Sequence, residues 1–156
     1  MIKTLLEYLH NRSQTQAKIS SMTASKLQKY AYKSLEEFVI KHGQFYTPAP
    51  RPKRLRLGIP RHCFHNSFNL AKRHKWIYVE GFALSVIPVL HAWCVKPDSN
   101  QVIDITWDEP GTEYIGVPFN WNYVKAHRHS NDCLSLIDNW SAEWPLLEGA
   151  DNSWKY

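Results

Sequence analysis

A proline-rich run in the first third of the chain constrains the fold most strongly. It reads Thr47-Pro-Ala-Pro-Arg-Pro-Lys-Arg. Each proline removes a backbone donor and biases the residue before it toward extended geometry. Neither a helix nor a central strand can include this run. It therefore predicts a surface crossing between two differently built parts of the chain.

The predicted organisation is a single domain over residues 1–156 in four consecutive parts. These are a helical preface (1–46), the proline-rich and basic crossing (47–59), a core segment (60–119) and a Trp-rich C-terminal segment (120–156). This length can bury a core without a metal or disulfides. The composition, 44% hydrophobic and 13% aromatic, excludes the polar, aromatic-poor class of disordered chains.

Apolar residues spaced by three and four predict helices before the crossing. One helix is expected over residues 24–42, with Thr23 or Ser25 as its cap and Gly43 after its end. Residues 12–21 are expected to be a polar connection. A shorter helix precedes that connection, on four apolar residues: Ile2, Leu5, Leu6 and Leu9.

After the crossing, the pattern predicts one helix and a small antiparallel sheet, which makes the fold class α+β. The helix covers residues 61–75 and begins after Pro60. Strand-like segments follow at 76–83, 89–95, 101–107 and 114–119, and the turn sequence Lys96-Pro-Asp-Ser-Asn100 joins the second to the third as a hairpin. A last helix is expected from the stripe Cys133, Leu136, Ile137 and Trp140, behind a cap at Asn131 or Asp132.

The chain has three cysteines, an odd number at scattered spacing that argues against a disulfide framework. A catalytic thiolate needs a site that favours negative charge, such as the first turn of a helix. Cys63 stands there, three residues after Pro60. The ordinary alternative for any free cysteine is a buried structural role, and this is what we expect for Cys94 and Cys133.

The predicted hairpin brings an acid beside a histidine. A four-residue loop over 96–99 puts His91 directly opposite Asp104. Shifting the register by one pair puts Asp104 opposite Trp93, still on the same face as His91. An acid beside an imidazole fixes its tautomer and stabilises its cation. The hypothesis is a catalytic triad of Cys63, His91 and Asp104.

Four segments carry a family resemblance, and they read Cys63-Phe-His-Asn-Ser-Phe-Asn-Leu-Ala71, Tyr78-Val-Glu-Gly-Phe-Ala83, His91-Ala-Trp93 and Val102-Ile-Asp-Ile-Thr-Trp107. Over residues 60–119 the chain resembles the transglutaminase-like core of the papain group. It is also similar to the arylamine N-acetyltransferases, which share the Cys, His, Asp order. Ile105 stands where the family usually has proline. The flanking helices resemble those of small bacterial or phage proteins.

The resemblance implies a papain- or transglutaminase-like α+β core, with the nucleophile helix packed on a small antiparallel sheet and preceded by N-terminal helices. It implies a cysteine hydrolase or acyltransferase: an amide or peptide hydrolase, a deamidase or a transglutaminase-type enzyme. The substrate would be a protein or a small amide or ester, and no cofactor is implied. The alternative is a non-catalytic protein on a degenerate form of this fold that binds an anionic or host partner through a basic patch. A plain nucleic-acid binder is a third reading.

Several further residues have both a functional and an ordinary interpretation. Trp93 and Trp107 could wall a substrate cleft, although aromatic residues on strands more often lie in the core. Glu80, a charge within an apolar strand, is either paired or faces the cleft. Asn66, one turn beyond Cys63, either orients the site or bonds to solvent.

The formal net charge of +5 is concentrated between residues 51 and 62. Arg54, Arg56 and Arg61 could bind an anionic group or stabilise the thiolate, or belong to a solvated loop. The run has no interleaved aromatic residues, which argues against recognition of single-stranded nucleic acid by stacking.

Metal and membrane sites are not expected. Cys63, His65, His91 and Cys94 include zinc-ligand types, but an offset of three along a strand sends His91 and Cys94 to opposite faces. The longest apolar region, 82–95, is too short to span a membrane, and the start lacks a signal-peptide pattern. A cytoplasmic location is therefore predicted.

Overall fold

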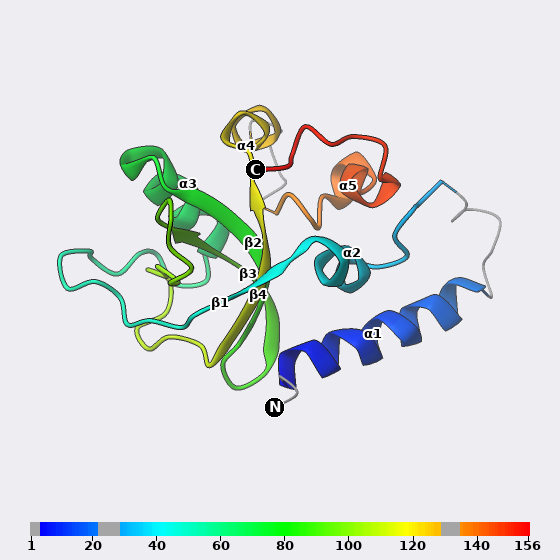
Figure 1. The fold of residues 1–156 in the computed structure, drawn as a ribbon, viewed down its shortest axis with the longest axis horizontal. Helices are drawn as coiled ribbons and strands as arrows, with labels where there is room; N and C mark the ends of the chain where they lie inside the picture. The colour runs from blue at the N-terminus through cyan, green and yellow to red at the C-terminus, as the bar shows by residue number, and fades with distance from the viewer. Residues whose placement is uncertain (1–3, 22–28, 129–134) are drawn as a thin grey trace.

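The computed structural model describes residues 4–21, 29–128 and 135–156, which combine helices with an antiparallel sheet (Figure 1). The predicted α+β class is confirmed. The strands are β1 (Gln44–Tyr46), β2 (Ile77–Leu84), β3 (Pro88–Val95) and β4 (Glu113–Phe119). The helices are α1 (Thr4–Ser21), α2 (Leu35–His42), α3 (Cys63–His74), α4 (Trp121–Arg128), the 3-10 helix η1 (Trp140–Ala142) and α5 (Pro145–Glu148).

The four strands form one sheet in the order β1-β4-β2-β3, and a short segment joins its two edges. Thr47, directly after edge strand β1, bridges Gln101, and Cys94 on edge strand β3 bridges Ile103. Because residues 101–103 contact both edges, the sheet curls and has an interior and an outer face. We call this arrangement the curled sheet.

Apolar side chains, mostly from alternate strand positions, fill the interior of the curled sheet. They are Tyr46, Val79, Ala83, Trp93, Val95, Val102 and Tyr114. Trp93, which pairs with Val79, fits because its ring reaches across to Gly116, a residue without a side chain. A Cβ added to Gly116 would lie 2.6 Å from the Trp93 ring, closer than any normal contact. The interior is thus built around one large ring.

The outer face of the sheet packs against the helices. One hydrophobic cluster takes residues from α1, α2, α3, α4 and α5, including Leu5, Phe38, Leu70, Val124 and Leu147. In Figure 1, α1, α2 and α5 lie to the right of the sheet, and α3 lies to its left with the 47–62 segment. Helix α3 is therefore held between the outer face and the crossing segment.

The N-terminal helices differ from the prediction. Helix α1 continues to Ser21, so the expected polar connection at 12–21 is wrong. Glu113 accepts hydrogen bonds from the first amides of α1, at Thr4 and Leu5 (3.1 and 2.9 Å), so a partner distant in sequence fixes this helix. Of the expected helix over 24–42, only α2 forms within the described residues.

The boundaries of α2 have a local cause. Its N-cap is Ser34, whose hydroxyl accepts from the amide of Glu37 (3.1 Å), whereas the expected caps Thr23 and Ser25 lie outside the described residues. The predicted end at Gly43 is confirmed.

Two predictions in the second half are also corrected. Residues 101–107 form isolated bridges instead of a strand, because this segment is shared between two edges. Residues 135–139 are not helical, and the other half of that predicted helix, with Cys133 and its caps Asn131 and Asp132, lies outside the described residues. The helix expected over 61–75 and the strands expected at 76–83, 89–95 and 114–119 are confirmed.

Among the described residues, no helix has the length and apolar character needed to cross a bilayer.

Candidate active site

The segment before α3 sets where Cys63 points. Arg61 has a φ of 64°, a left-handed conformation that is uncommon for residues with a side chain and that recurs at functional sites. The amide of His62 donates to the carbonyl of Ile59 (3.2 Å), which closes a turn. Helix α3 then begins directly at Cys63.

Cys63 occupies the electropositive end of a 12-residue helix. The first amides of a helix have no intrahelical acceptor, and together they favour a negative charge nearby. No acidic residue stands in the first turn of α3 to compensate that field. The thiol side chain is buried, with 9% of the residue exposed. The helix end thus places a positive electrostatic field beside the sulfur.

His91 lies between Asp104 and Cys63. It is 2% exposed, and its Nε2 is 2.7 Å from Oδ2 of Asp104. The side chain of Cys63 is close enough to the ring to raise its pKa. With Nε2 facing Asp104, Nδ1 is the nitrogen left for the thiol. The structure therefore brings together the three residues of the predicted triad.

The imidazole of His91 is also covered by an aromatic ring. Trp107 stacks on it with ring centroids 4.0 Å apart and an interplanar angle of 12°. Such stacking fixes the ring plane and favours the imidazolium form. Trp107, predicted as a cleft wall, is partly exposed and lies directly on the base.

Asp104 is fixed by two donors besides His91. The amide of Thr106 donates to Oδ1 (2.8 Å), and the hydroxyl of Tyr114 is 3.4 Å from Oδ2. Sequence analysis missed both partners. The Thr106 contact had a signal, since an Asp that accepts from the amide two residues later is a common turn. The Tyr114 contact had none, because it depends on how the sheet curls.

The observed register is the second of the two that the hairpin allowed. Cys94 and Ile103 exchange backbone hydrogen bonds of 3.0 and 2.7 Å, so Asp104 comes opposite Trp93 rather than His91. The expectation that His91 and Asp104 lie directly opposite is wrong. The diagonal arrangement still keeps both side chains on one face.

The pKa of His91 reflects opposing effects. Burial lowers the pKa, while the hydrogen bonds and charges of Asp104 and Cys63 raise it, and the net result is a pKa of about 9. The imidazole is thus held in its protonated form at neutral pH. An imidazolium beside a thiol is the arrangement that favours a thiolate.

Asn66 links the nucleophile helix to the acid. Its side chain accepts from the amide of Ile59 (3.1 Å) and donates to the carbonyl of Ile59 (2.8 Å) and to Oγ1 of Thr106 (3.1 Å). Only 4% of the residue is exposed, so the solvent-bonded interpretation is wrong. Because Thr106 in turn holds Asp104, the side chain of Asn66 positions the loop before Cys63 relative to the acid.

Glu80 and Trp93 do not line an open cleft, and both cleft predictions are corrected. Glu80 is completely buried on the outer face of β2. Its carboxylate accepts from the hydroxyls of Tyr78 and Ser135 (2.6 and 2.8 Å) and from the amides of Leu136 and Ile137. Burial raises the pKa of Glu80, and these donors oppose that effect. Trp93, also completely buried, fills the curled sheet.

The surroundings of Cys94, the other cysteine within the described residues, make its thiol unreactive. The Cys94 thiol is completely buried and donates to the carbonyl of Ser67 (3.2 Å). Burial raises the pKa of this thiol far above its usual range. Cys133 lies outside the described residues. No cluster of metal-ligand residues occurs in ranges 4–21, 29–128 and 135–156.

The three predicted anion-binding residues are exposed. Arg54, Arg56 and Arg61 precede Cys63 on the loop. No ion pair to any of them occurs within the described part of the chain, whereas Arg51 nearby contacts Asp108 at 3.3 Å.

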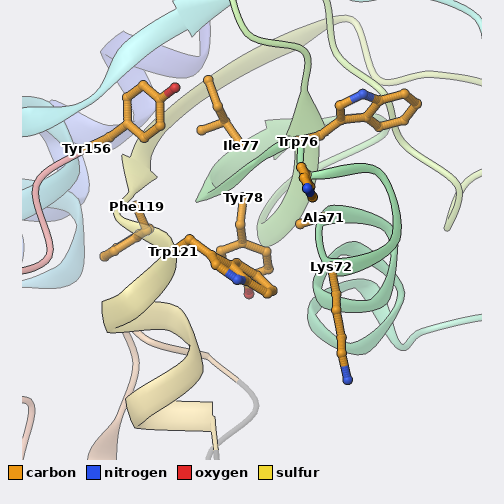
Figure 2. A pocket seen from close by; sticks show the side chains of 9 residues that line it. Ala71, Lys72, Trp76, Ile77, Tyr78, Phe119, Trp121 and Tyr156 are labelled. Carbon is orange, nitrogen blue, oxygen red and sulfur yellow. The ribbon is translucent and has the colours of Figure 1, made fainter.

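Two hollows flank α3. The cavity in Figure 2, of about 350 Å³, lies at the end of α3 that is far from Cys63, between Ala71 and Tyr78 on one side and Phe119 and Trp121 on the other. No triad residue lines it. The second, of about 530 Å³, runs between residues 57–60 and α3 and includes Asn66 in its lining. Only the second reaches the network around the triad.

Comparisons with known proteins give no relative: no family, curated protein or solved structure matches this chain.

Proposed function

We propose that this protein is an enzyme with a cysteine nucleophile that transfers acyl groups, on a core of the papain and transglutaminase type. The observation that carries the proposal is the position of His91, which is hydrogen-bonded to Asp104 and lies near enough to Cys63 for that side chain to raise its pKa. Nucleophile, base and orienting acid are the three roles that a triad needs.

In the first step, the proton of the Cys63 thiol already lies on His91, and the thiolate sulfur attacks the carbonyl carbon of an amide or ester. The carbonyl π electrons move to oxygen. The amide of Cys63, at the free end of α3, is the donor that we assign to this oxyanion. Collapse expels the amine or alcohol, which receives the proton from His91, and leaves a thioester on Cys63.

In the second step, His91 deprotonates water, and the resulting hydroxide attacks the thioester. The C–S bond breaks, the sulfur of Cys63 leaves as a thiolate that shares the proton now on His91, and the products are a carboxylic acid and the regenerated Cys63–His91 pair. An amine in place of water gives transfer instead of hydrolysis. Asp104 accepts from the imidazolium throughout, and Trp107 keeps the ring in plane.

The test is acylation by p-nitrophenyl acetate, with the modified peptide located by mass spectrometry. We expect an initial burst of p-nitrophenolate and one acetyl group on Cys63 that neutral hydroxylamine removes. The burst should disappear in Cys63→Ala and in His91→Ala and persist in Cys94→Ala. Acetylation of lysines alone, or equal acetylation of Cys63 without His91, would refute the proposal.

A second candidate function is that of a binding protein for an anionic partner. It is favoured by the exposure of Arg54, Arg56 and Arg61, which lack ion pairs within the described residues. Retention on heparin-agarose tests it: replacing all three arginines by alanine should abolish retention at low salt. Unchanged retention would eliminate this function.

A further inference from the structure

We propose that the hollow between residues 57–60 and α3 is a substrate subsite, and that it binds an extended peptide with a bulky aliphatic residue and, farther from the reacting group, an acidic one. We call this hollow the α3 groove. It is lined by Leu57, Gly58, Ile59, Pro60, His65, Asn66, Asn69, Leu70, Arg73 and Ile105. The inference rests on the proposed function, because it names the substrate of the same site.

The α3 groove begins one helical turn from the nucleophile, at Asn66, which is three residues after Cys63 on the same helix. Besides His65, the lining includes three further residues of α3, Asn69, Leu70 and Arg73, which follow Asn66 at spacings of three and four and so form one stripe along the helix. A peptide in the groove would therefore run along α3 from the thiol.

The middle of the α3 groove is aliphatic. Leu57 and Ile59, on the loop side, are 44% and 52% exposed. Leu70 is buried below them, and Ile105 directly follows the acid of the triad. Bulky aliphatic residues exposed around a hollow are typical of a binding site. They would contact a Leu-like side chain of the substrate.

The far end of the α3 groove is cationic. Arg73 is exposed, and no residue in the described lining is acidic. Ten residues separate it from Cys63, which corresponds to about 15 Å along a helix axis. An extended chain advances about 3.3 Å per residue. The acidic group of the substrate should therefore be four to five residues from the reacting carbonyl.

The experiment uses peptide alkylating agents of both chain polarities, with the reactive group at the N-terminal end in one and at the C-terminal end in the other. Together they cover both directions in which a peptide can lie along α3. One is chloroacetyl-Gly-Leu-Leu-Gly-Glu amide, and the other is acetyl-Glu-Gly-Leu-Leu-Gly chloromethyl ketone. Companion probes carry Gln for Glu, or Ser for both Leu. Rates of Cys63 alkylation are measured at pH 9, where even an ordinary thiol reacts, in the full chain and in two variants. Arg73→Gln changes the groove, and Lys72→Gln is the matched control, because Lys72 lines the other cavity.

In one polarity, the Glu probe should react roughly fivefold faster than the Gln probe, as expected for one exposed charge pair. The Leu probe should likewise react faster than the Ser probe. Arg73→Gln should abolish the preference for the Glu probe and leave the rate at which iodoacetamide alkylates Cys63 unchanged. Lys72→Gln should keep the preference for the Glu probe.

Equal rates for Glu and Gln probes in both polarities would overturn the inference. So would equal loss of preference in Lys72→Gln and Arg73→Gln, or failure of every probe to reach a Cys63 that iodoacetamide labels. If the acyl-transfer proposal alone fails, p-nitrophenyl acetate gives no burst, yet the probe preference at pH 9 is still measured. The two failures are therefore distinguishable.

Discussion

Two buried carboxylates lie on opposite faces of the curled sheet, and their partners differ. Asp104, toward the interior, contacts an imidazole, one backbone amide and one phenol. Glu80, on the outer face, contacts two hydroxyls and two backbone amides of neutral partners. Both satisfy the requirement that a buried acid be hydrogen-bonded. Only Asp104 is coupled to a group that can exchange a proton with a nucleophile.

With the proposed function, the difference assigns a structural role to Glu80 and a chemical role to Asp104. Glu80 fastens residues 135–137 to β2 and explains why the chain returns to the sheet there. Asp104 fixes the base beside Cys63. Burial of an acid in a strand therefore does not by itself indicate a reactive site; the titratable partner does.

The largest expected effect is on stability, from Glu80→Ala. The substitution leaves two hydroxyls and two amides without their buried acceptor, which should lower the free energy of unfolding by about 4 kcal/mol. Urea titration measures it. The folded variant should keep the iodoacetamide rate of Cys63. A loss of less than about 1 kcal/mol, or a large fall in Cys63 reactivity, would break the assignment of Glu80 to structure.

The next effect is a pH dependence of stability that originates at His91. Burial lowers its pKa, but Asp104 and Cys63 raise it to about 9, above the ordinary 6.5 of the unfolded chain. The protonated form therefore stabilises the fold fully below about pH 6.5. This contribution is lost as the pH rises through 9.

The raised pKa of His91 sets the size of this contribution: the free energy of unfolding should fall by roughly 3 kcal/mol between pH 6.5 and pH 9.5. Unfolding by urea at the two pH values measures it. In His91→Asn, the fall over this range should largely vanish. A native protein whose stability rises from pH 6.5 to 9.5 would contradict the raised pKa.

A smaller effect is expected for Asp104→Asn, on reactivity. The amide can still accept from Thr106, but it no longer carries the charge that favours the imidazolium of His91. The iodoacetamide rate of Cys63 at pH 6 should fall roughly thirtyfold, equivalent to about 2 kcal/mol. Glu80→Gln is the matched control and should leave this rate unchanged. Equal effects of the two substitutions would erase the distinction between the acids.

The smallest effect is expected for Cys94→Ala. Its thiol has one buried hydrogen bond, to the carbonyl of Ser67, so the substitution should cost about 1 kcal/mol of stability. The labelling of Cys63 by iodoacetamide should not change, because Cys94 packs on the outer face. Faster labelling of Cys94 than of Cys63 in the native chain would reverse the roles of the two thiols.

The parts of the fold that local sequence determines were predictable. Helix α3 follows Pro60, and β2, β3 and β4 follow their β-branched and aromatic residues. Helix α1 past residue 11 was missed because its residues are polar and its start depends on distant Glu113. The missing strand at 101–107 has a similar cause, since this segment is divided between Thr47 and Cys94.

The site shows the same division between what local sequence determines and what tertiary packing determines. The proximity of His91 and Asp104 could be predicted, because both possible registers put their side chains on one face. No local pattern indicated the contact of Tyr114 with Asp104, because it depends on tertiary packing. An orienting role for Asn66 was one of two interpretations, and its partners Ile59 and Thr106 decide between them. Of the two interpretations of Glu80, the sequence could not select the paired one, because its partners, residues 135–137, were assigned to a helix.

The central claim is that His91 activates Cys63. The most direct test measures the pH dependence of iodoacetamide alkylation at Cys63 by peptide mass spectrometry, in the native protein and in His91→Ala. We predict selective labelling of Cys63 that persists below about pH 7 and falls roughly a hundredfold at pH 6 in the variant. If Cys63 reacts no faster than Cys94, or if its rate does not depend on His91, the catalytic account is contradicted.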